Sequence, residues 1–164
     1  MSSTGLRPLQ NTPSTARISQ YNNNSLGAVY SSLHGFWASR QAAANATGQN
    51  AAAARRDAYS VILFDSSAAT YISNDFTSSP DDLLNRIVAH QPQGGTDYTQ
   101  ALNQAQSLMV RHWSNERYAI PVHRHCWPLL TSQRSPVLIF LSDGICSVSD
   151  ATVRSVCRAA IDRG

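Results

Sequence analysis

Apolar residues recur at helical spacing in four stretches of the 164-residue chain. An apolar side chain at every third or fourth position lies on one face of a helix, the face that packs against a core. The sequence therefore predicts four amphipathic helices, which begin at Leu26, at Pro80, at Thr96 or Asp97, and at Asp150. Their predicted inward-facing residues are Leu26, Val29, Tyr30, Leu33 and Trp37; Leu83, Leu84, Ile87 and Val88; Ala101, Leu102, Ala105, Leu108, Met109 and Trp113; and Val153, Val156, Cys157, Ala160 and Ile161.

Three short apolar runs predict strands. Tyr59–Phe64 and Thr70–Ser73 are separated by Asp65-Ser66-Ser67, a combination typical of a hairpin turn. Val137–Leu141 is apolar at every position, as expected of a central parallel strand that is buried on both faces. Since the chain contains both predicted strands and predicted helices, we predict an α/β fold. Its sheet is mainly parallel, with Tyr59–Phe64 and Val137–Leu141 in that one sheet and helices on both faces.

The pattern divides the chain into a polar leader and one domain. Residues 1–25 hold few apolar side chains and are predicted to be disordered, and the domain occupies residues 26–164. At Gly164 the fold is expected to be truncated, so its sheet should leave an edge and some apolar surface uncovered. Within the domain, residues 118–134 fit no predicted element.

The insert at 118–134 has three interpretations. It is an unusually long surface loop, a zinc site, or translated intron sequence whose removal would leave a short helix-to-strand connection. The zinc interpretation rests on His123, His125 and Cys126 with His112 upstream, but these residues lack the paired spacing of structural zinc sites.

Composition narrows the function classes. The net charge is only +3, and the thirteen basic residues are arginines scattered along the chain, so no nucleic-acid partner is expected. No segment resembles a signal peptide or is apolar for long enough to span a bilayer, so we expect a cytoplasmic location and no membrane partner. Three cysteines without paired spacing do not predict a disulfide framework, and Cys157 is expected to be buried as a small apolar residue.

Two polar residues are predicted to meet at the carboxyl edge of the sheet, where open α/β folds bind their ligands. Asp143 follows the strand Val137–Leu141, and Thr96 follows Gly94-Gly95 at the start of a helix. A carboxylate and a hydroxyl are hard oxygen ligands that suit Mg²⁺. Each residue also has a simpler role, because Thr96 can cap the helix and Asp143 can begin a turn with Gly144.

The order of these motifs resembles the von Willebrand factor type A family. In that family a first strand ends in Asp-x-Ser-x-Ser, a Thr follows in a Gly-rich loop, and an Asp-Gly ends a central strand. The last two elements match Thr96 and Asp143, so the resemblance implies a metal-ion-dependent adhesion site whose metal ligands here are Thr96 and Asp143. The resemblance also implies a Rossmann-like, doubly wound fold. It further implies protein recognition, in which an acidic side chain of the partner completes the coordination of the cation.

The first family motif has no counterpart before the helix at Leu26, since no Asp occurs before Asp57. Asp65-Ser66-Ser67-Ala68-Ala69 is rejected as a substitute because its fifth residue is Ala and a strand, not a helix, follows it. The metal site is therefore predicted to be degenerate. We expect Mg²⁺ to bind weakly or not at all, because two protein oxygens offer little chelation.

The sequence thus predicts a protein-binding module rather than an enzyme, one that a multidomain parent protein could contain. One alternative is an α/β enzyme that uses Asp143 and a phosphate cradle at the Gly-Gly-Thr turn, although the chain has no Lys to meet a phosphate. Another alternative is a non-functional fragment from an incomplete gene model.

Overall fold

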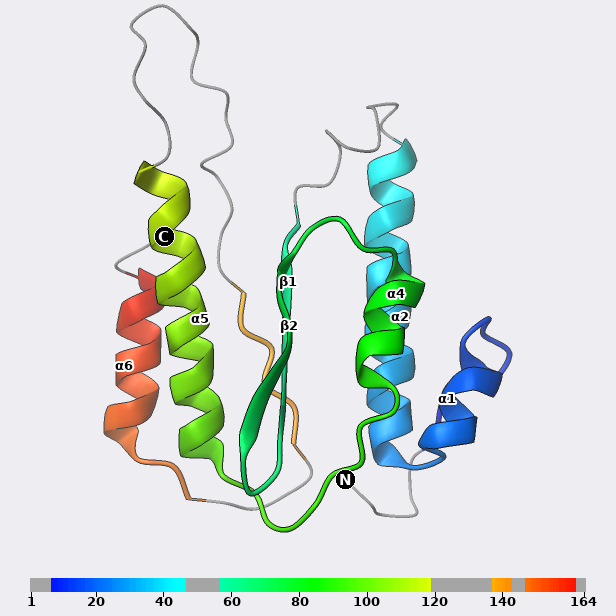
Figure 1. Cartoon of the computed structure of the whole chain (residues 1–164), viewed down its shortest axis with the longest axis horizontal. Coiled ribbons are helices and arrows are strands. Elements are labelled where there is room, and N and C mark those ends of the chain that lie inside the picture. The colour runs from blue at the N-terminus through cyan, green and yellow to red at the C-terminus, as the bar shows by residue number, and fades with distance from the viewer. Residues whose placement is uncertain (1–6, 47–56, 119–136, 143–146, 162–164) are drawn as a thin grey trace, which may run out of the picture. The chain divides into compact units, whose positions relative to one another are not determined.

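The computed structural model describes residues 7–46, 57–118, 137–142 and 147–161, with the backbone alone for residues 113–118. The chain divides into two compact units. The first contains helices α1, α2 and α4, and the second contains most of the hairpin β1–β2 together with α5 and α6 (Figure 1).

The first unit is built on the long helix α2, which runs over Ser25–Ala46 and packs against α1 (Thr15–Tyr21) and α4 (Pro80–Ile87). Asn24 caps α2, because its Oδ1 accepts a hydrogen bond of 3.2 Å from the backbone N–H of Gly27. The predicted apolar face of α2 is confirmed for Leu26, Tyr30 and Trp37, which are buried, whereas Val29 and Leu33 are half-buried.

Helix α1 lies inside the segment 1–25 that we expected to be disordered. Its Ile18 is fully buried, and the neighbouring Asn22 donates from Nδ2 to the backbone carbonyl of Val88 at 2.7 Å. Arg17 extends to α4, where it forms an ion pair of 2.5 Å with Asp81. One buried isoleucine and two long-range polar contacts order this short polar helix. The expectation of disorder considered apolar content alone, and it is wrong for residues 15–21.

Helix α4 begins as predicted, at Pro80, after a complete capping box. The Ser79 hydroxyl accepts from the backbone N–H of Asp82 at 3.1 Å, and the Asp82 carboxylate accepts from the backbone N–H of Ser79 at 3.2 Å. Leu83, Leu84 and Ile87 then enter the core. The buried residues of α4 are therefore the ones that its apolar period predicts.

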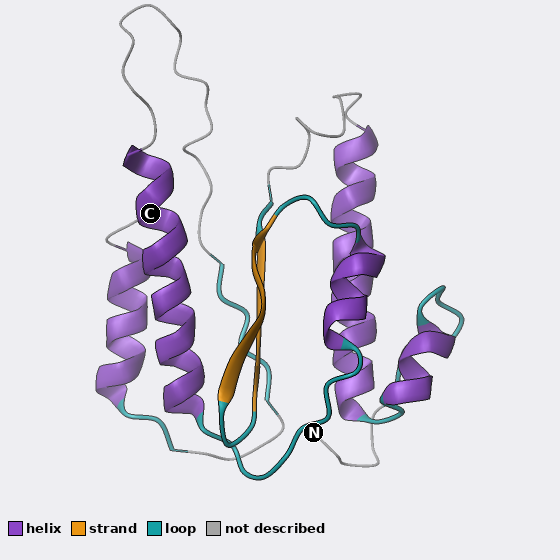
Figure 2. Ribbon diagram, in the orientation of Figure 1, coloured by secondary structure: helices purple, strands orange, loops and turns teal. Residues whose placement is uncertain are grey.

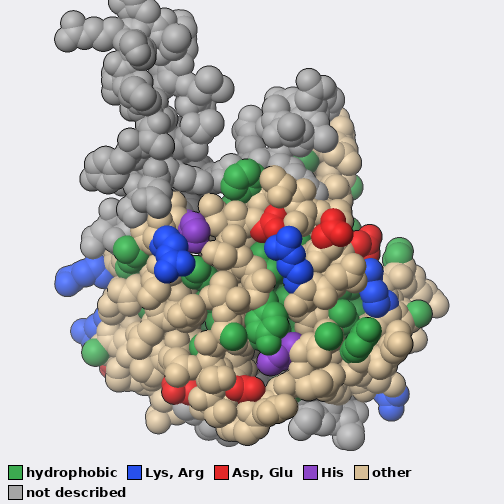
Figure 3. Space-filling view, viewed as in Figure 1, with side chains coloured by type: hydrophobic (Ala, Val, Ile, Leu, Met, Phe, Trp, Pro, Cys, Tyr) green, Lys and Arg blue, Asp and Glu red, His purple; other side chains and the backbone are tan. Residues whose placement is uncertain are grey.

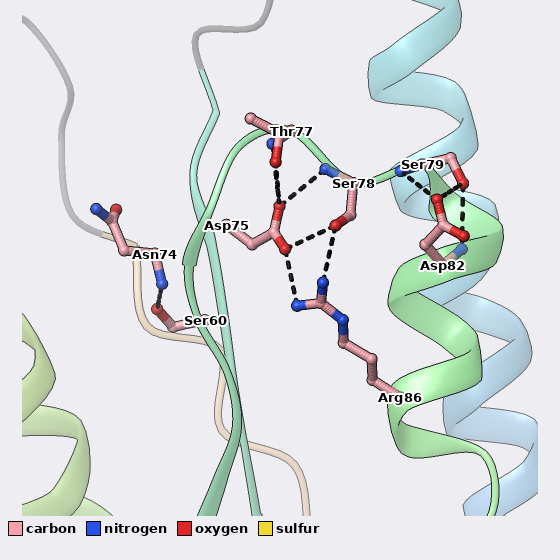
Figure 4. A network of polar contacts seen from close by, with 8 residues as sticks. All are labelled: Ser60, Asn74, Asp75, Thr77, Ser78, Ser79, Asp82 and Arg86. Carbon is pink, nitrogen blue, oxygen red and sulfur yellow. Dashed lines mark hydrogen bonds and ion pairs between the residues drawn. The ribbon is translucent and has the colours of Figure 1, made fainter.

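The segment leading into α4 is fixed by the Asp75 carboxylate (Figure 4). Its Oδ1 accepts from the backbone N–H of Ser78 at 2.9 Å, and its Oδ2 accepts from the Ser78 hydroxyl at 2.8 Å and from Arg86 at 2.9 Å. Burial acts to raise the pKa of Asp75, but the hydrogen bonds from Ser78 and Thr77 and the charge of Arg86 outweigh it and lower that pKa to about 2. The carboxylate is thus held ionised as the centre of this connection.

In the second unit, β1 (Tyr59–Phe64) and β2 (Ala68–Asp75) form the predicted hairpin (Figure 2). Helix α5 (Tyr98–Tyr118) is linked to β2 by polar side chains at intervals of one or two helical turns. Gln100 accepts from the backbone N–H of Ala68, Gln104 donates to Thr70 at 2.8 Å, and His112 hydrogen-bonds Ser73 at 2.9 Å. Its apolar face is confirmed for Ala101, Ala105 and Leu108, which are buried.

Val137–Leu141 does not form the expected buried strand. These five residues are in no strand, and their exposed fractions run from 40% for Phe140 to 79% for Val137. Among the described residues the only sheet is the two-stranded hairpin, so the mainly parallel, doubly wound sheet is absent there. A strand forms only where a neighbouring strand supplies hydrogen-bond partners, and within the described residues β1 pairs with β2 and no strand lies beside Val137–Leu141.

Helix α6 (Asp150–Ile161) begins at the predicted Asp150, and Ser149 caps it, because the Ser149 hydroxyl accepts from the backbone N–H of Thr152 at 3.2 Å. The helix packs on α5 and buries Val156 and Ala159. Val153, Cys157 and Ile161 are exposed, so their predicted burial is wrong. Because α6 packs on α5, only the side chains that face α5 are buried, and they form a narrower stripe than the predicted apolar face. No helix in the described ranges is both long and apolar enough to cross a membrane.

Candidate functional site

Thr96 lies in the loop that precedes α5, and it is half-buried. The adjacent Asp97 caps the helix, because its Oδ1 accepts a hydrogen bond of 2.9 Å from the backbone N–H of Gln100. Its backbone carbonyl accepts from the N–H of Ala101 at 3.3 Å, as expected at a helix start. From the sequence alone, either Thr96 or Asp97 could cap this helix. The structure assigns it to Asp97, and Thr96 precedes the cap.

Gly94 gives this loop its shape. Its φ of +78° lies in the left-handed region, which residues with a side chain rarely adopt. A Cβ at this position would also lie 3.1 Å from the Ser66 hydroxyl oxygen, which is closer than ordinary packing. At Gly95, by contrast, an added Cβ would meet no atom within 4 Å. The first glycine of the Gly-Gly-Thr motif is therefore the one that the structure requires.

The turn Asp65-Ser66-Ser67 closes the hairpin, as predicted. The Asp65 carboxylate accepts from the backbone N–H of Ser67 at 2.9 Å, while the Asp65 N–H donates to the Ser67 carbonyl at 2.8 Å. Strand β2 follows directly, so the turn does not lead into a helix. The rejection of this turn as the first motif of the family is consistent with that geometry.

Sequence reasoning did not foresee that the hairpin turn and the Gly-Gly-Thr loop lie side by side. The backbone N–H of Asp97 donates to the Asp65 carbonyl at 2.7 Å, and Gly94 packs against Ser66. No signal in the sequence predicts this contact, because it joins two loops about thirty residues apart, one after β1 and the other after α4. Thr96 thus lies close to a second group of hard oxygen atoms, those of Asp65 and the adjacent serines.

Asp143, the other predicted ligand, lies outside the described residues. The described segment before it approaches the Thr96 loop through aromatic contacts. The Phe140 ring stacks on Phe64 at a centroid distance of 5.2 Å and meets Tyr98 edge-on at 5.3 Å. Phe64 ends β1, and Tyr98 follows Thr96 by two positions. That Thr96 and Asp143 face one cleft stays a prediction.

The described residues do not by themselves fit Mg²⁺. This part of the chain contains no group of three His, Cys, Asp or Glu side chains placed to hold a metal ion. Thr96 is the one predicted ligand within it, and a single neutral hydroxyl does not displace the tightly held water of Mg²⁺.

The zinc interpretation depends on residues outside the described ranges, since His123, His125 and Cys126 all lie there. The upstream histidine, His112, is described, and it hydrogen-bonds the Ser73 hydroxyl at 2.9 Å across α5 and β2. This contact gives His112 a structural role in the packing of the second unit.

On the face drawn in Figure 3, arginine side chains occur singly and do not gather into one basic patch. Several are already neutralised in ion pairs, including Arg40 with Asp57 at 2.6 Å. The hydrogen bond and charge of Asp57 raise the pKa of Arg40 above its usual range. This face therefore lacks the concentrated positive charge that binds a phosphate backbone.

Comparison with known proteins identifies the class of domain. Residues 23–145 match the family model of the von Willebrand factor type A domain, which is well over half of the chain. The chain belongs to this family, and the family implies a Rossmann-like α/β fold and a role in protein interaction. Comparisons with curated proteins and with solved structures gave no match.

Proposed function

We propose that the chain is a protein-recognition module of the von Willebrand factor type A class whose metal-ion-dependent adhesion site is degenerate. Membership of the family is the observation that carries this proposal. Domains of this class bind other proteins, and some do so through a bound metal ion. In this chain Thr96 and Asp143 are the retained parts of that site.

The position of Thr96 supports its assignment to the site. Because Asp97 supplies the helix cap, the Thr96 hydroxyl is not needed to start α5. The loop is held by the left-handed Gly94 and by the hydrogen bond from Asp97 to Asp65. A hydroxyl on a fixed loop loses little conformational entropy when it contacts a partner.

We further propose that the domain has no catalytic activity. Catalysis by a nucleophile needs a base that is oriented by a third group. Ser73 and His112 form a hydroxyl–imidazole pair, but in the described part of the chain no carboxylate pairs with His112. The pair links a strand to a helix at the surface.

The experiment is affinity capture with the immobilised full chain, followed by binding measurements between the purified chain and each captured protein. Binding is measured with Mg²⁺, with EDTA, and with the Thr96→Ala variant. We expect a direct partner whose affinity falls several-fold with Thr96→Ala and changes little with EDTA. If no captured protein binds the purified chain directly, or if a captured molecule is chemically converted, the proposal is wrong.

A further inference from the structure

The contact between α1 and the rest of the first unit is mainly polar. The buried positions of α1 and its two flanking residues are Ser14, Ile18 and Asn22, which are spaced four residues apart and are each no more than 1% exposed. Only Ile18 is apolar. Surfaces that stay in contact permanently are dominated by apolar residues, whereas surfaces that separate are more polar. The composition of this stripe is therefore that of a contact that opens.

Buried polar atoms in α1 and α2 lack a hydrogen-bond partner among the described residues. In α1 and its carboxyl cap they are Nε of Arg17 and Oδ1 of Asn22, and in α2 the Oγ atom of Ser31 is one of them. Such an atom has lost its hydration and gains no hydrogen bond in exchange, so it weakens the packing around it. Helix α1 therefore docks with part of its polar chemistry unsatisfied, and this favours its release.

The ion pair that joins α1 to α4 is open to solvent. Arg17 donates from Nη2 to the Asp81 carboxylate at 2.5 Å and from Nη1 to the Asn85 side chain at 3.2 Å. The Asp81 side chain is 67% exposed, so a competing arginine has access to it. An exposed ion pair contributes little to stability, and salt screens it. Arg17 therefore recognises α4 without locking α1 to it.

Helix α1 lies outside the part of the chain that matches the family. The match covers residues 23–145, and α1 precedes it. Helix α1 has seven residues, and an isolated helix this short is not stable in water, so it is helical only while docked. Its release removes nothing from the matched domain and exposes the α1 site, which is the surface of α2 and α4 that α1 contacts, including Asp81 and Asn85.

We propose that the α1 site binds a partner protein and that α1 is its displaceable occupant. Helix α1 opens while the rest of the first unit stays folded, and a partner helix that carries an arginine followed by an aliphatic residue takes its place. The arginine pairs with Asp81, and the aliphatic side chain fills the buried position of Ile18. The α1 site belongs to the first unit and Thr96 to the second, so this inference goes beyond the proposed recognition through Thr96.

The short connection to α2 makes α1 a strong competitor for its own site. Only residues 22–24 separate the two helices, so α1 is presented to the site at a high effective concentration. A free helix therefore binds well only where α1 has been weakened. The Ile18→Asp substitution weakens it, because a charged side chain does not enter the fully buried position of Ile18 without a large loss of hydration.

The first test is native-state hydrogen exchange of the wild-type full chain. The Asn22 amide donates to the Ile18 carbonyl at 2.8 Å, and the matched Val88 amide, directly after α4, donates to the Leu84 carbonyl at 2.9 Å. Both residues are buried, so a difference in exchange reports the opening of α1. We expect Asn22 to exchange at least about 100-fold faster than Val88. Equal protection of the two amides would overturn the inference, because α1 would then open only with the whole unit.

The second test measures the binding of a helix to the α1 site, with a fluorescein-labelled peptide of residues 8–24 as the probe. Its affinity for the Ile18→Asp full chain and for the wild-type chain is measured by fluorescence anisotropy in EDTA. Peptides with Arg17→Ala and with Gln20→Ala are compared, and the second is the matched control because Gln20 is exposed. Circular dichroism verifies that the Ile18→Asp chain remains folded.

We expect the peptide to bind the Ile18→Asp chain saturably and the wild-type chain at least about tenfold more weakly. Arg17→Ala in the peptide should weaken binding about threefold or more, and Gln20→Ala should leave it unchanged. No saturable binding to a folded Ile18→Asp chain, equal binding to the two chains, or equal binding by the two peptide variants would overturn the inference. So would sedimentation showing that two copies of the chain exchange α1. If Ile18→Asp does not fold, the exchange test decides, and neither test involves Thr96 or Mg²⁺.

Discussion

The backbone N–H of Asp97 donates a hydrogen bond of 2.7 Å to the backbone carbonyl of Asp65. This bond joins the loop that carries Thr96 to the hairpin turn that follows β1. The same Asp97 caps α5 through its side chain. One residue therefore starts the helix and positions the loop, and the neighbouring Thr96 is not part of that cap.

This division of roles predicts different effects for two adjacent substitutions. Asp97→Ala should destabilise the protein by about 1 kcal/mol, because it removes the cap of α5. Thr96→Ala should change stability by less than about 0.5 kcal/mol, as expected away from a cap. Urea denaturation of both variants checks this. A larger loss for Thr96→Ala than for Asp97→Ala would show that Thr96 is the structural residue of the pair.

Gly27 and Gly35 on α2 provide a second matched pair. A Cβ at Gly27 would overlap the Asn22 carbonyl oxygen and lie 2.9 Å from Pro8, whereas a Cβ at Gly35 would meet no atom within 4 Å. Gly27→Ala should therefore cost about 3 kcal/mol through overpacking. Gly35→Ala should stabilise by about 0.5–1 kcal/mol through helix propensity. Thermal unfolding monitored by circular dichroism measures both, and similar shifts in the two variants would contradict the close α1–α2 packing.

The Asp75 network predicts a specific loss of stability in acid. The pKa of Asp75 is lowered to about 2 in the folded protein, below the value near 3.9 in an unfolded chain, so its contribution is complete above that value. The contribution then disappears as the pH falls from about 4 to 2. Its size is about 1–2 kcal/mol, since Arg86 is half exposed although the Asp75 side chain is largely buried.

Asp75→Asn should remove this contribution at neutral pH and flatten the acid dependence between about pH 4 and pH 2. Arg86→Met should give a smaller change in the same direction, because the hydrogen bonds from Ser78 remain. The measurement is the free energy of unfolding as a function of pH. If the free energy of unfolding of Asp75→Asn depends on pH as that of the wild type does, the group that titrates in acid is not Asp75.

The sequence predicted those elements whose signals are local. Strand β1 matches the predicted Tyr59–Phe64, and α4 begins at the predicted Pro80, because period and capping chemistry are properties of neighbouring residues. Val137–Leu141 has an equally clear strand pattern, but a strand also requires a partner, and the described chain supplies none beside it. The prediction that Cys157 is buried is wrong for a related reason, since contact with α5 decides which face of α6 is covered.

The candidate site was predicted in part for the same reason. The motif order identified the family and the loop of Thr96, and family membership is confirmed. The assignment of the cap to Asp97 and the contact between Asp97 and Asp65 depend on how two distant loops meet. Motifs along a chain do not specify that meeting.

The central claim is a recognition domain with a degenerate metal site, and titration calorimetry of the full chain with MgCl₂ tests it most directly. One hydroxyl and one carboxylate offer Mg²⁺ too few ligands to offset the loss of its water. The account predicts no binding tighter than millimolar, with wild type and Asp143→Ala indistinguishable. A variant given a first strand ending in Asp-x-Ser-x-Ser should bind Mg²⁺ more tightly. Tight binding by the present chain would contradict the degenerate site, and tight binding that survives Asp143→Ala would also contradict the assignment of Asp143 to it.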